Sequence, residues 1–171
     1  MLCRQEIFDG NVIEPLPLPV IRDLVVDREL LSNMSSEIHE KTGKVKGGIS
    51  ITEKDTEYLR NLDMCMDCDV CHVSCPYFAV EEKKFVGPEF MVDTARHTFD
   101  PRIDKEKSLK VAFELGVWDC AACKLCDVRC PKNINPMEWI VNLRQTLIET
   151  PKLNRVPSKV RDLNVSLVKY G

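Results

Sequence analysis

The chain contains nine cysteines, and eight of them fall into two runs that share one spacing. The first run is Cys65, Cys68, Cys71 and Cys75, and the second is Cys120, Cys123, Cys126 and Cys130. Both runs read C-x2-C-x2-C-x3-C-P, because Pro76 follows the first and Pro131 follows the second. Thiolates at such short spacings are ligands for metal centres. The two runs are therefore the residues of this chain with the most evident chemistry.

The spacing is typical of ferredoxin ligands for two 4Fe–4S clusters. Three cysteines set three residues apart on a tight loop can converge on three corners of a cubane, and small neighbours such as Ala121 and Ala122 leave room for it. In two-cluster ferredoxins the fourth cysteine of each run binds the other cluster. We therefore predict two 4Fe–4S clusters as cofactors. Cluster 1 is expected on Cys65, Cys68, Cys71 and Cys130, and cluster 2 on Cys120, Cys123, Cys126 and Cys75.

Zinc is the main alternative metal. Zinc ribbons pair two C-x2-C knuckles, so eight thiolates could fill two such sites. Zinc, however, needs neither a third cysteine at i+6 nor a proline after the run. Disulfides fit less well, because the spacing is of the metal type and residues 1–10 lack the apolar core of a secretory signal.

The composition narrows the classes of function further. The formal net charge is −3 at pH 7 and the pI is about 5.7, which argues against a nucleic-acid partner bound by a basic surface. No apolar run is long enough for a transmembrane helix. We therefore expect a cytoplasmic protein that reaches a membrane only through its partners.

The segments around the cysteines have helical patterns. Residues 28–41, 52–62, 88–98, 104–115 and 136–149 carry apolar residues at helical spacing, and 158–170 could form a last amphipathic helix. The expected end signals are Asp27, Gly43, Thr52 with Asp55, Pro88, Gly116, and Asn135 with Pro136. The expected core side chains are Leu30, Leu31, Met34, Ile38, Phe90, Met91, Val92, Ala95, Leu109, Ala112, Phe113, Leu115, Met137, Ile140, Val141, Leu147 and Ile148.

The N-terminal part has a different pattern. Pro15, Pro17 and Pro19 disfavour a helix there. We predict an extended arm over residues 1–27, a helical body over 28–150 that holds both clusters between helix pairs, and a tail over 151–171. Strand signal is weak beyond residue 27, so the expected fold class is mainly α. The arm and the tail are expected to wrap partner subunits.

Further motifs accompany the two cysteine runs. They are IEPLP at 13–17, VIRDLVVD at 20–27, FVGP at 85–88, DPR at 100–102 and NP at 135–136. With them, residues 11–148 resemble the C-terminal half of the iron–sulfur subunit of succinate dehydrogenases and fumarate reductases. The chain is equally similar to the two-cluster subunit of archaeal heterodisulfide reductase and to the matching part of thiol:fumarate reductase. The resemblance implies an α-helical ferredoxin fold.

Three differences from the common succinate dehydrogenases affect what the resemblance implies. The common type lacks a cysteine at the position of Cys123 and holds a 3Fe–4S cluster there. Because Cys123 is present in this chain, we expect a complete 4Fe–4S cubane. The common type also has a quinone-site His at the position of Ala121 and a Trp within the segment matching 77–80, and neither is present here. Finally, residues 1–4 resemble only the last ligand segment of the family's 2Fe–2S domain. Cys3 is thus a remnant ligand, a ligand completed by another chain, or a free thiol.

These observations lead to the hypothesis of a non-catalytic electron-transfer subunit. It would pass single electrons between a flavin-containing partner and a reductase subunit, because no catalytic residue set stands out beside the cysteines. His72, inside the first run, is expected to be a solvated loop residue, with hydrogen bonding to cluster 1 as the alternative. His39 and His97 are expected to be ordinary surface or packing residues. Val70, Val73, Leu125 and Val128 are expected to exclude water from the clusters.

The missing quinone residues and the complete second ligand set favour the heterodisulfide reductase or thiol:fumarate reductase type. The alternative is a succinate dehydrogenase or fumarate reductase subunit with a nonstandard second cluster. Two other classes stay open. One is a catalytic subunit whose exposed cluster reduces a disulfide directly, and the other is a zinc-bound assembly module without redox activity.

Overall fold

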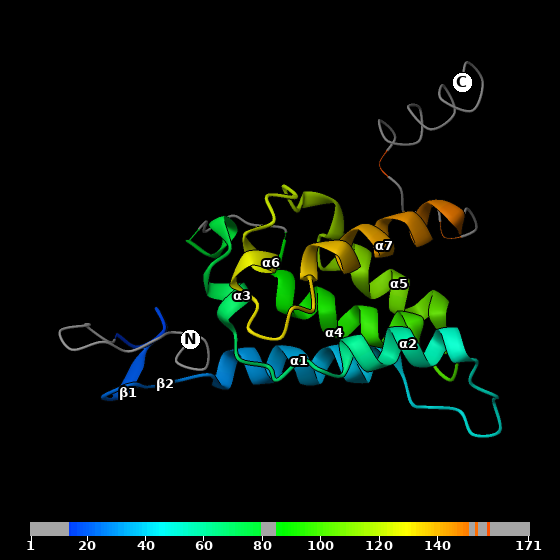
Figure 1. Ribbon diagram of the computed structural model, residues 1–171, viewed down its shortest axis with the longest axis horizontal. Helices are drawn as coiled ribbons and strands as arrows, with labels where there is room; N and C mark the ends of the chain where they lie inside the picture. The colour runs from blue at the N-terminus through cyan, green and yellow to red at the C-terminus, as the bar shows by residue number, and fades with distance from the viewer. Residues whose placement is uncertain (1–13, 80–84, 151–152, 154–156, 158–171) are drawn as a thin grey trace, which may run out of the picture.

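The computed structural model describes residues 14–79, 85–150, 153 and 157 (Figure 1). Cys3, the predicted helix over 158–170 and most of the predicted tail lie outside the described residues. In chain order the elements are β1 (Val20–Arg22), β2 (Val25–Val26), α1 (Glu29–Thr42), α2 (Glu53–Leu62), α3 (Val70–Val73), η1 (Pro76–Ala79), α4 (Pro88–Phe99), α5 (Lys105–Glu114), η2 (Val117–Asp119), α6 (Leu125–Arg129) and α7 (Pro136–Glu149). The prediction of a mainly α fold is confirmed.

Helix α4 is the centre of the fold. It packs against α1, α2, α5 and α7, and Figure 1 shows it running between α7 on one side and α1 and α2 on the other. Most of its residues are buried, including the predicted core residues Phe90, Met91, Val92 and Ala95. A helix surrounded by others must be apolar on nearly every face. The buried polar side chains of α4, such as Glu89 and Asp93, therefore require specific partners.

The end signals largely confirm the helix predictions. Thr52 and Asp55 form a reciprocal capping box at α2. Pro88 occupies the first turn of α4, and Gly116 after α5 has a φ of 77° that suits glycine. Asn135 is a correction, because its side chain makes no capping hydrogen bond. Asp127 from α6 accepts the Met137 N–H at 2.8 Å instead, so the second cysteine run is fastened to the start of α7.

Two predicted core residues are exposed. Leu30 is 74% exposed on α1, and Val141 is 42% exposed on α7. On α7 the buried face is made by Trp139, Ile140, Leu143 and Leu147. These residues recur three or four positions apart and so share one side of the helix, whereas Val141 points away from it. Trp139 and Leu143 were not among the predicted core residues.

The described part of the N-terminal arm contains a short hairpin. β1 and β2 pair antiparallel around a turn in which Asp23 has a φ of 52°. The prolines exclude a helix as expected, but the chain folds back on itself instead of running straight along the body. Of its apolar residues, only Leu18 packs against the core, beside α1. Among the described residues, no helix has the length and apolar character needed to cross a membrane.

Candidate metal centres

Both cysteine runs fold into the same kind of loop. In the first, Asp67 and Asp69 have positive φ values of 46° and 58°. In the second, the matching residues are Ala122 and Lys124, with φ values of 54° and 62°. Left-handed backbone costs roughly 1 kcal/mol for a residue other than glycine, so it persists only where the surroundings impose it. Alternating left-handed residues turn successive N–H groups inward, which creates a concave site for an anion.

The loops bring the eight cysteines together in two separate cavities. Each cavity takes three cysteines from one run and the last cysteine of the other run. The first is lined by Cys65, Cys68, Cys71 and Cys130, and the second by Cys120, Cys123, Cys126 and Cys75. All eight thiols are free of disulfides. The exchange of the fourth cysteine requires α3 and α6 to lie side by side, which they do.

Several of these thiols are buried enough to favour the protonated form. Burial raises the pKa of Cys65 and of Cys126 to about 12 and the pKa of Cys71 well above its ordinary value. The thiolate is the form that binds metal. A metal centre in either cavity must therefore displace protons, and its assembly is coupled to pH.

Hydrogen bonds to the sulfur atoms come from the backbone. The Ala122 N–H donates to Cys120 Sγ at 3.4 Å, and the Ile134 N–H donates to Cys130 Sγ at 3.4 Å. Such donors stabilise negative charge on a thiolate–metal centre and help set its potential. Four cysteines per cavity with inward N–H groups fit the ligand requirement of a 4Fe–4S cluster.

An arginine from the core secures the entrance to each loop. Arg96 of α4 donates to the carbonyl of Leu62 at 3.1 Å, at the end of α2. Arg144 of α7 donates to the carbonyls of Val117 at 2.9 Å and Cys120 at 2.6 Å. Neither arginine was identified from the sequence, because no local pattern connects it to the loop it holds.

The two cavities differ in their electrostatics. The first has buried carboxyl groups beside it, Asp69 and Glu89, and Arg28 forms an ion pair with Asp69. Burial, followed by the neighbouring Asp69, raises the pKa of Glu89 to about 9. The second is lined mostly by apolar side chains, among them Phe85 and Ile140. The environment is therefore acidic around the first cavity and apolar around the second.

Two expectations about the surroundings are wrong. His72 is 4% exposed, not solvated, and its ring meets the rings of Phe78 and Phe90 edge-on. Val128 is 75% exposed and is not placed to exclude water, whereas Leu125 lines the second cavity although it is 39% exposed. Much of the remaining apolar lining of the second cavity comes from residues outside the second cysteine run, among them Phe85 and Ile140.

Comparisons with known proteins agree with this geometry. Residues 61–134 match the family described as "4Fe-4S dicluster domain". Among curated relatives, the chain is 36% identical over 153 residues to a subunit of the "Fumarate reductase (CoM/CoB)" of Methanothermobacter marburgensis, covering 84% of this chain and 29% of that protein. It is 29% identical over 153 residues to the succinate dehydrogenase iron–sulfur subunit of Coxiella burnetii, covering 85% and 65%.

The fold is also found in a solved structure. The chain aligns with a chain of the "Mycobacterium smegmatis Sdh1 complex in the apo form" at a TM-score of 0.63 and 21% identity, covering 80% of this chain and 60% of that one. The chain spans less than a third of the length of its archaeal relatives and about half to two thirds of the succinate dehydrogenase and fumarate reductase subunits.

These matches support one coarse identification. The chain contains a dicluster ferredoxin domain with two 4Fe–4S clusters as its cofactors, and the eight cysteine positions lie within residues 61–134. It is similar to the C-terminal ferredoxin half of fumarate reductase and succinate dehydrogenase iron–sulfur subunits.

Proposed function

We propose that this chain, given its similarity to the ferredoxin half of those subunits, passes single electrons through two 4Fe–4S clusters inside a multi-subunit reductase. The donor and acceptor would be a flavin-containing partner and a reductase subunit, in either direction. One observation carries the proposal: there are two cavities, each lined by four cysteines drawn from both runs, and the helices α3 and α6 of those runs are in contact. Two adjacent clusters form a path for electrons, whereas a single structural metal does not.

We assign the ligands from the cysteines that line each cavity. Cluster 1 takes Cys65, Cys68, Cys71 and Cys130, and cluster 2 takes Cys120, Cys123, Cys126 and Cys75. The arrangement supports the crossed assignment expected for two-cluster ferredoxins. Because each run contributes to both clusters, the metal centres would link the two loops to each other.

For the kind of complex, we favour the heterodisulfide reductase or thiol:fumarate reductase type. The similarity to the archaeal "Fumarate reductase (CoM/CoB)" supports this choice. Cys123 and Ala121 both line the second cavity, which supports a complete set of four cysteine ligands and no histidine at position 121. The second candidate is a succinate dehydrogenase or fumarate reductase subunit with a complete second cubane, which the bacterial relatives favour.

The division of the chain follows the same proposal. Residues 28–150 would be the cluster-bearing body, and residues 1–27 and 151–171 would contact partners. The described part of the arm supports this, because its hairpin exposes Val20, Ile21, Leu24 and Val25.

Iron analysis and EPR test the electron-path proposal. Two 4Fe–4S clusters predict about eight irons and eight sulfides per chain, with two interacting signals in the dithionite-reduced protein. About seven irons with a 3Fe–4S signal in the oxidised protein would contradict ligation by Cys123. A zinc-containing, colourless protein would contradict the redox function altogether.

The Cys123→Ser variant tests the second ligand set. Cys123 is the exposed member of its set, so we expect the substitution to be tolerated by the fold and to convert or destabilise cluster 2 alone. The iron content should fall by about one to four atoms per chain, while the signal of cluster 1 stays. Cys3→Ser is the matched control, because Cys3 belongs to neither run. Unchanged iron content and spectra in Cys123→Ser would remove Cys123 from the ligand set.

A further inference from the structure

A second group of metal-binding side chains lies away from the cysteines, between α1 and α4. It consists of His39 from α1 with Asp93 and His97 from α4, and one ligand atom from each lies within 4.8 Å of the others. Asp93 and His97 are four residues apart, so they share one face of α4. The two histidines were expected to be ordinary surface or packing residues. The packing of α1 on α4 brings them to one carboxylate instead.

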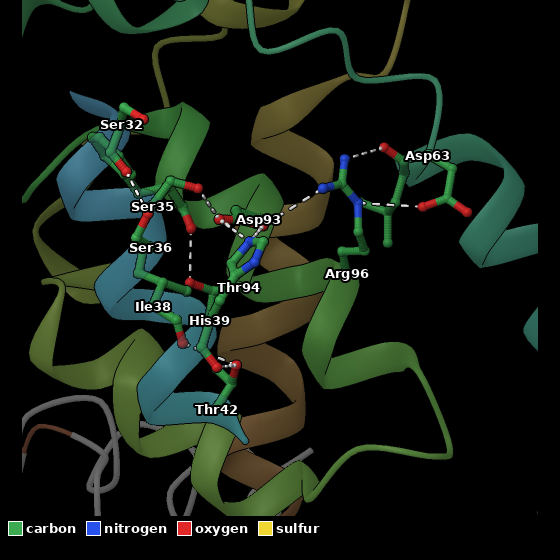
Figure 2. Close-up of polar contacts among 12 residues, drawn as sticks. Ser32, Ser35, Ser36, Ile38, His39, Thr42, Asp63, Asp93, Thr94 and Arg96 are labelled. Atoms are coloured by element: carbon green, nitrogen blue, oxygen red, sulfur yellow. Dashed lines mark hydrogen bonds and ion pairs between the residues drawn. The ribbon is translucent and has the colours of Figure 1, made fainter. Parts of the chain in front are cut away.

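The carboxylate at the centre of the group is held in position. Asp93 has a side chain that is only 8% exposed, and Ser35 Oγ donates to its Oδ2 at 2.8 Å. His39 Nε2 lies 3.0 Å from Oδ1 and 3.1 Å from Oδ2 (Figure 2). Two ligands at 2.0–2.1 Å from a tetrahedral zinc ion are roughly 3.4 Å apart. The two side chains are hydrogen-bonded to each other, and a bound ion would replace this hydrogen bond with only a few tenths of an ångström of added separation.

His97 supplies a second, independent observation. Its Nδ1 is buried and has no hydrogen-bond partner among the described residues, although a buried polar atom without a partner is costly. Its ring meets that of His39 edge-on, with centroids 4.7 Å apart. Burial lowers the pKa of His97, which keeps the imidazole in the neutral form that binds metals. A metal ion bound through Nδ1 would satisfy this nitrogen.

We propose that His39, Asp93 and His97 bind one divalent zinc ion, with water at the remaining position. Two histidines and one carboxylate are a recurrent zinc ligand set. The His39 side chain is 53% exposed, so an ion and its water have access from solvent. Ser35 orients the carboxylate as neighbouring donors do in other metal sites. Iron(II) accepts the same donors, and the test below distinguishes the two metals.

The ion would fasten the N-terminal helix to the centre of the fold. α1 follows the hairpin, and α4 carries Arg96, whose Nη1 lies 3.5 Å from Asp93 Oδ1. Arg96 also contacts Asp63 and the Leu62 carbonyl, just before the first cysteine run (Figure 2). Arg96 competes with the ion for one oxygen of Asp93, because both are positively charged. The proposed role is structural and does not depend on the electron-transfer proposal.

Zinc binding to the cluster-loaded full chain tests the site. The protein is first dialysed anaerobically against a mild chelator, then given zinc chloride and passed through a desalting column. We expect about one zinc per chain with the iron content unchanged. EXAFS at the zinc edge should show nitrogen and oxygen ligands at about 2.0–2.1 Å and no sulfur at about 2.3 Å. Zinc bound to sulfur would overturn the proposal, and so would displacement of zinc by an equal amount of iron(II).

Variants of the two histidines identify the ligands. His39→Ala, at a largely exposed side chain, and His97→Ala should each lower zinc affinity by about tenfold or more. Glu40→Ala is the matched control, because Glu40 is the exposed residue next to His39 on α1. Zinc should raise the midpoint of thermal denaturation of the wild type and of Glu40→Ala, but not of His39→Ala. The site would be contradicted if His39→Ala bound zinc as tightly as the wild type and showed the same zinc-induced shift of the thermal midpoint. This comparison does not require that His97→Ala folds.

Discussion

At the scale of single residues, Glu89 makes stability depend on pH. Burial raises its pKa from 4.5 to about 9, so between those values the folded chain keeps a proton that the unfolded chain has lost. Its contribution is complete below pH 4.5 and is lost as pH rises towards 9. Glu89→Gln should therefore have a higher midpoint of thermal denaturation than the wild type above about pH 5. This advantage should grow until about pH 9.

The measurement is the thermal midpoint of the cluster-loaded protein at several pH values. Glu57→Gln, at an exposed position on α2, is the matched control. We expect its curve to run parallel to that of the wild type. A parallel curve for Glu89→Gln would mean that Glu89 has an ordinary pKa in the folded chain.

Gly87 is a second residue whose identity the tertiary structure requires. A Cβ there would lie 2.2 Å from Nδ1 of His72, and its φ of 129° strains any other residue. Gly87→Ala should push α3 away and lower the free energy of unfolding by about 2 kcal/mol or more. Cluster 1 should also be released faster under a chelator. Gly47→Ala, which meets no atom within 4 Å, should change either quantity little, and equal effects of the two variants would contradict this account.

At the scale of elements, α7 is predicted to control cluster 2 through Arg144. This side chain bonds the carbonyls of Val117 and Cys120 and lies over the ring of Trp118. Arg144→Gln cannot make this set of contacts, so the start of the second run should loosen. We expect cluster 2 to be lost faster than cluster 1. Iron release and EPR measure the loss of each cluster. Arg129→Gln, an exposed arginine on α6, should behave as the wild type; equal loss from both clusters would argue against this role.

Helix α4 contributes residues to several sites. α4 contributes Glu89 and Val92 to the first cavity and Pro88 to the second. One turn further on, Asp93 reaches the histidines, and Arg96 reaches the end of α2. A buried central helix can do this because each of its faces meets a different neighbour. Disturbance of its packing should therefore affect both clusters and the proposed zinc site together.

At the scale of the whole molecule, the hairpin presents an unpartnered apolar surface. Ile21 is 66% exposed, and Leu24 and Val25 beside it are 46% and 56% exposed. If the arm contacts another protein of the complex, Ile21→Ser should reduce co-purification of the complex and leave the iron content unchanged. Val141→Ser, at an exposed position on α7, is the control. Loss of the clusters with the complex intact would contradict the partner role.

The sequence by itself determined the metal chemistry and the helices. The spacing within each cysteine run and the capping of α2 by Thr52 and Asp55 involve residues a few positions apart, so local geometry is enough to specify them. The mainly α fold follows from the same short-range patterns. The crossed ligand sets were predicted from the ferredoxin pattern, and the cysteines that line each cavity support them.

The tertiary structure alone decided how distant residues meet. His72 is buried because Phe90 and Gly87 close around it, and Arg96 and Arg144 reach loops 34 and 24 residues away. His39 and Asp93, separated by 54 residues, share a proposed site because α1 packs on α4. Such contacts depend on which helix faces are buried against each other. No local periodicity encodes that choice, because it is set by the free energy of packing the whole chain.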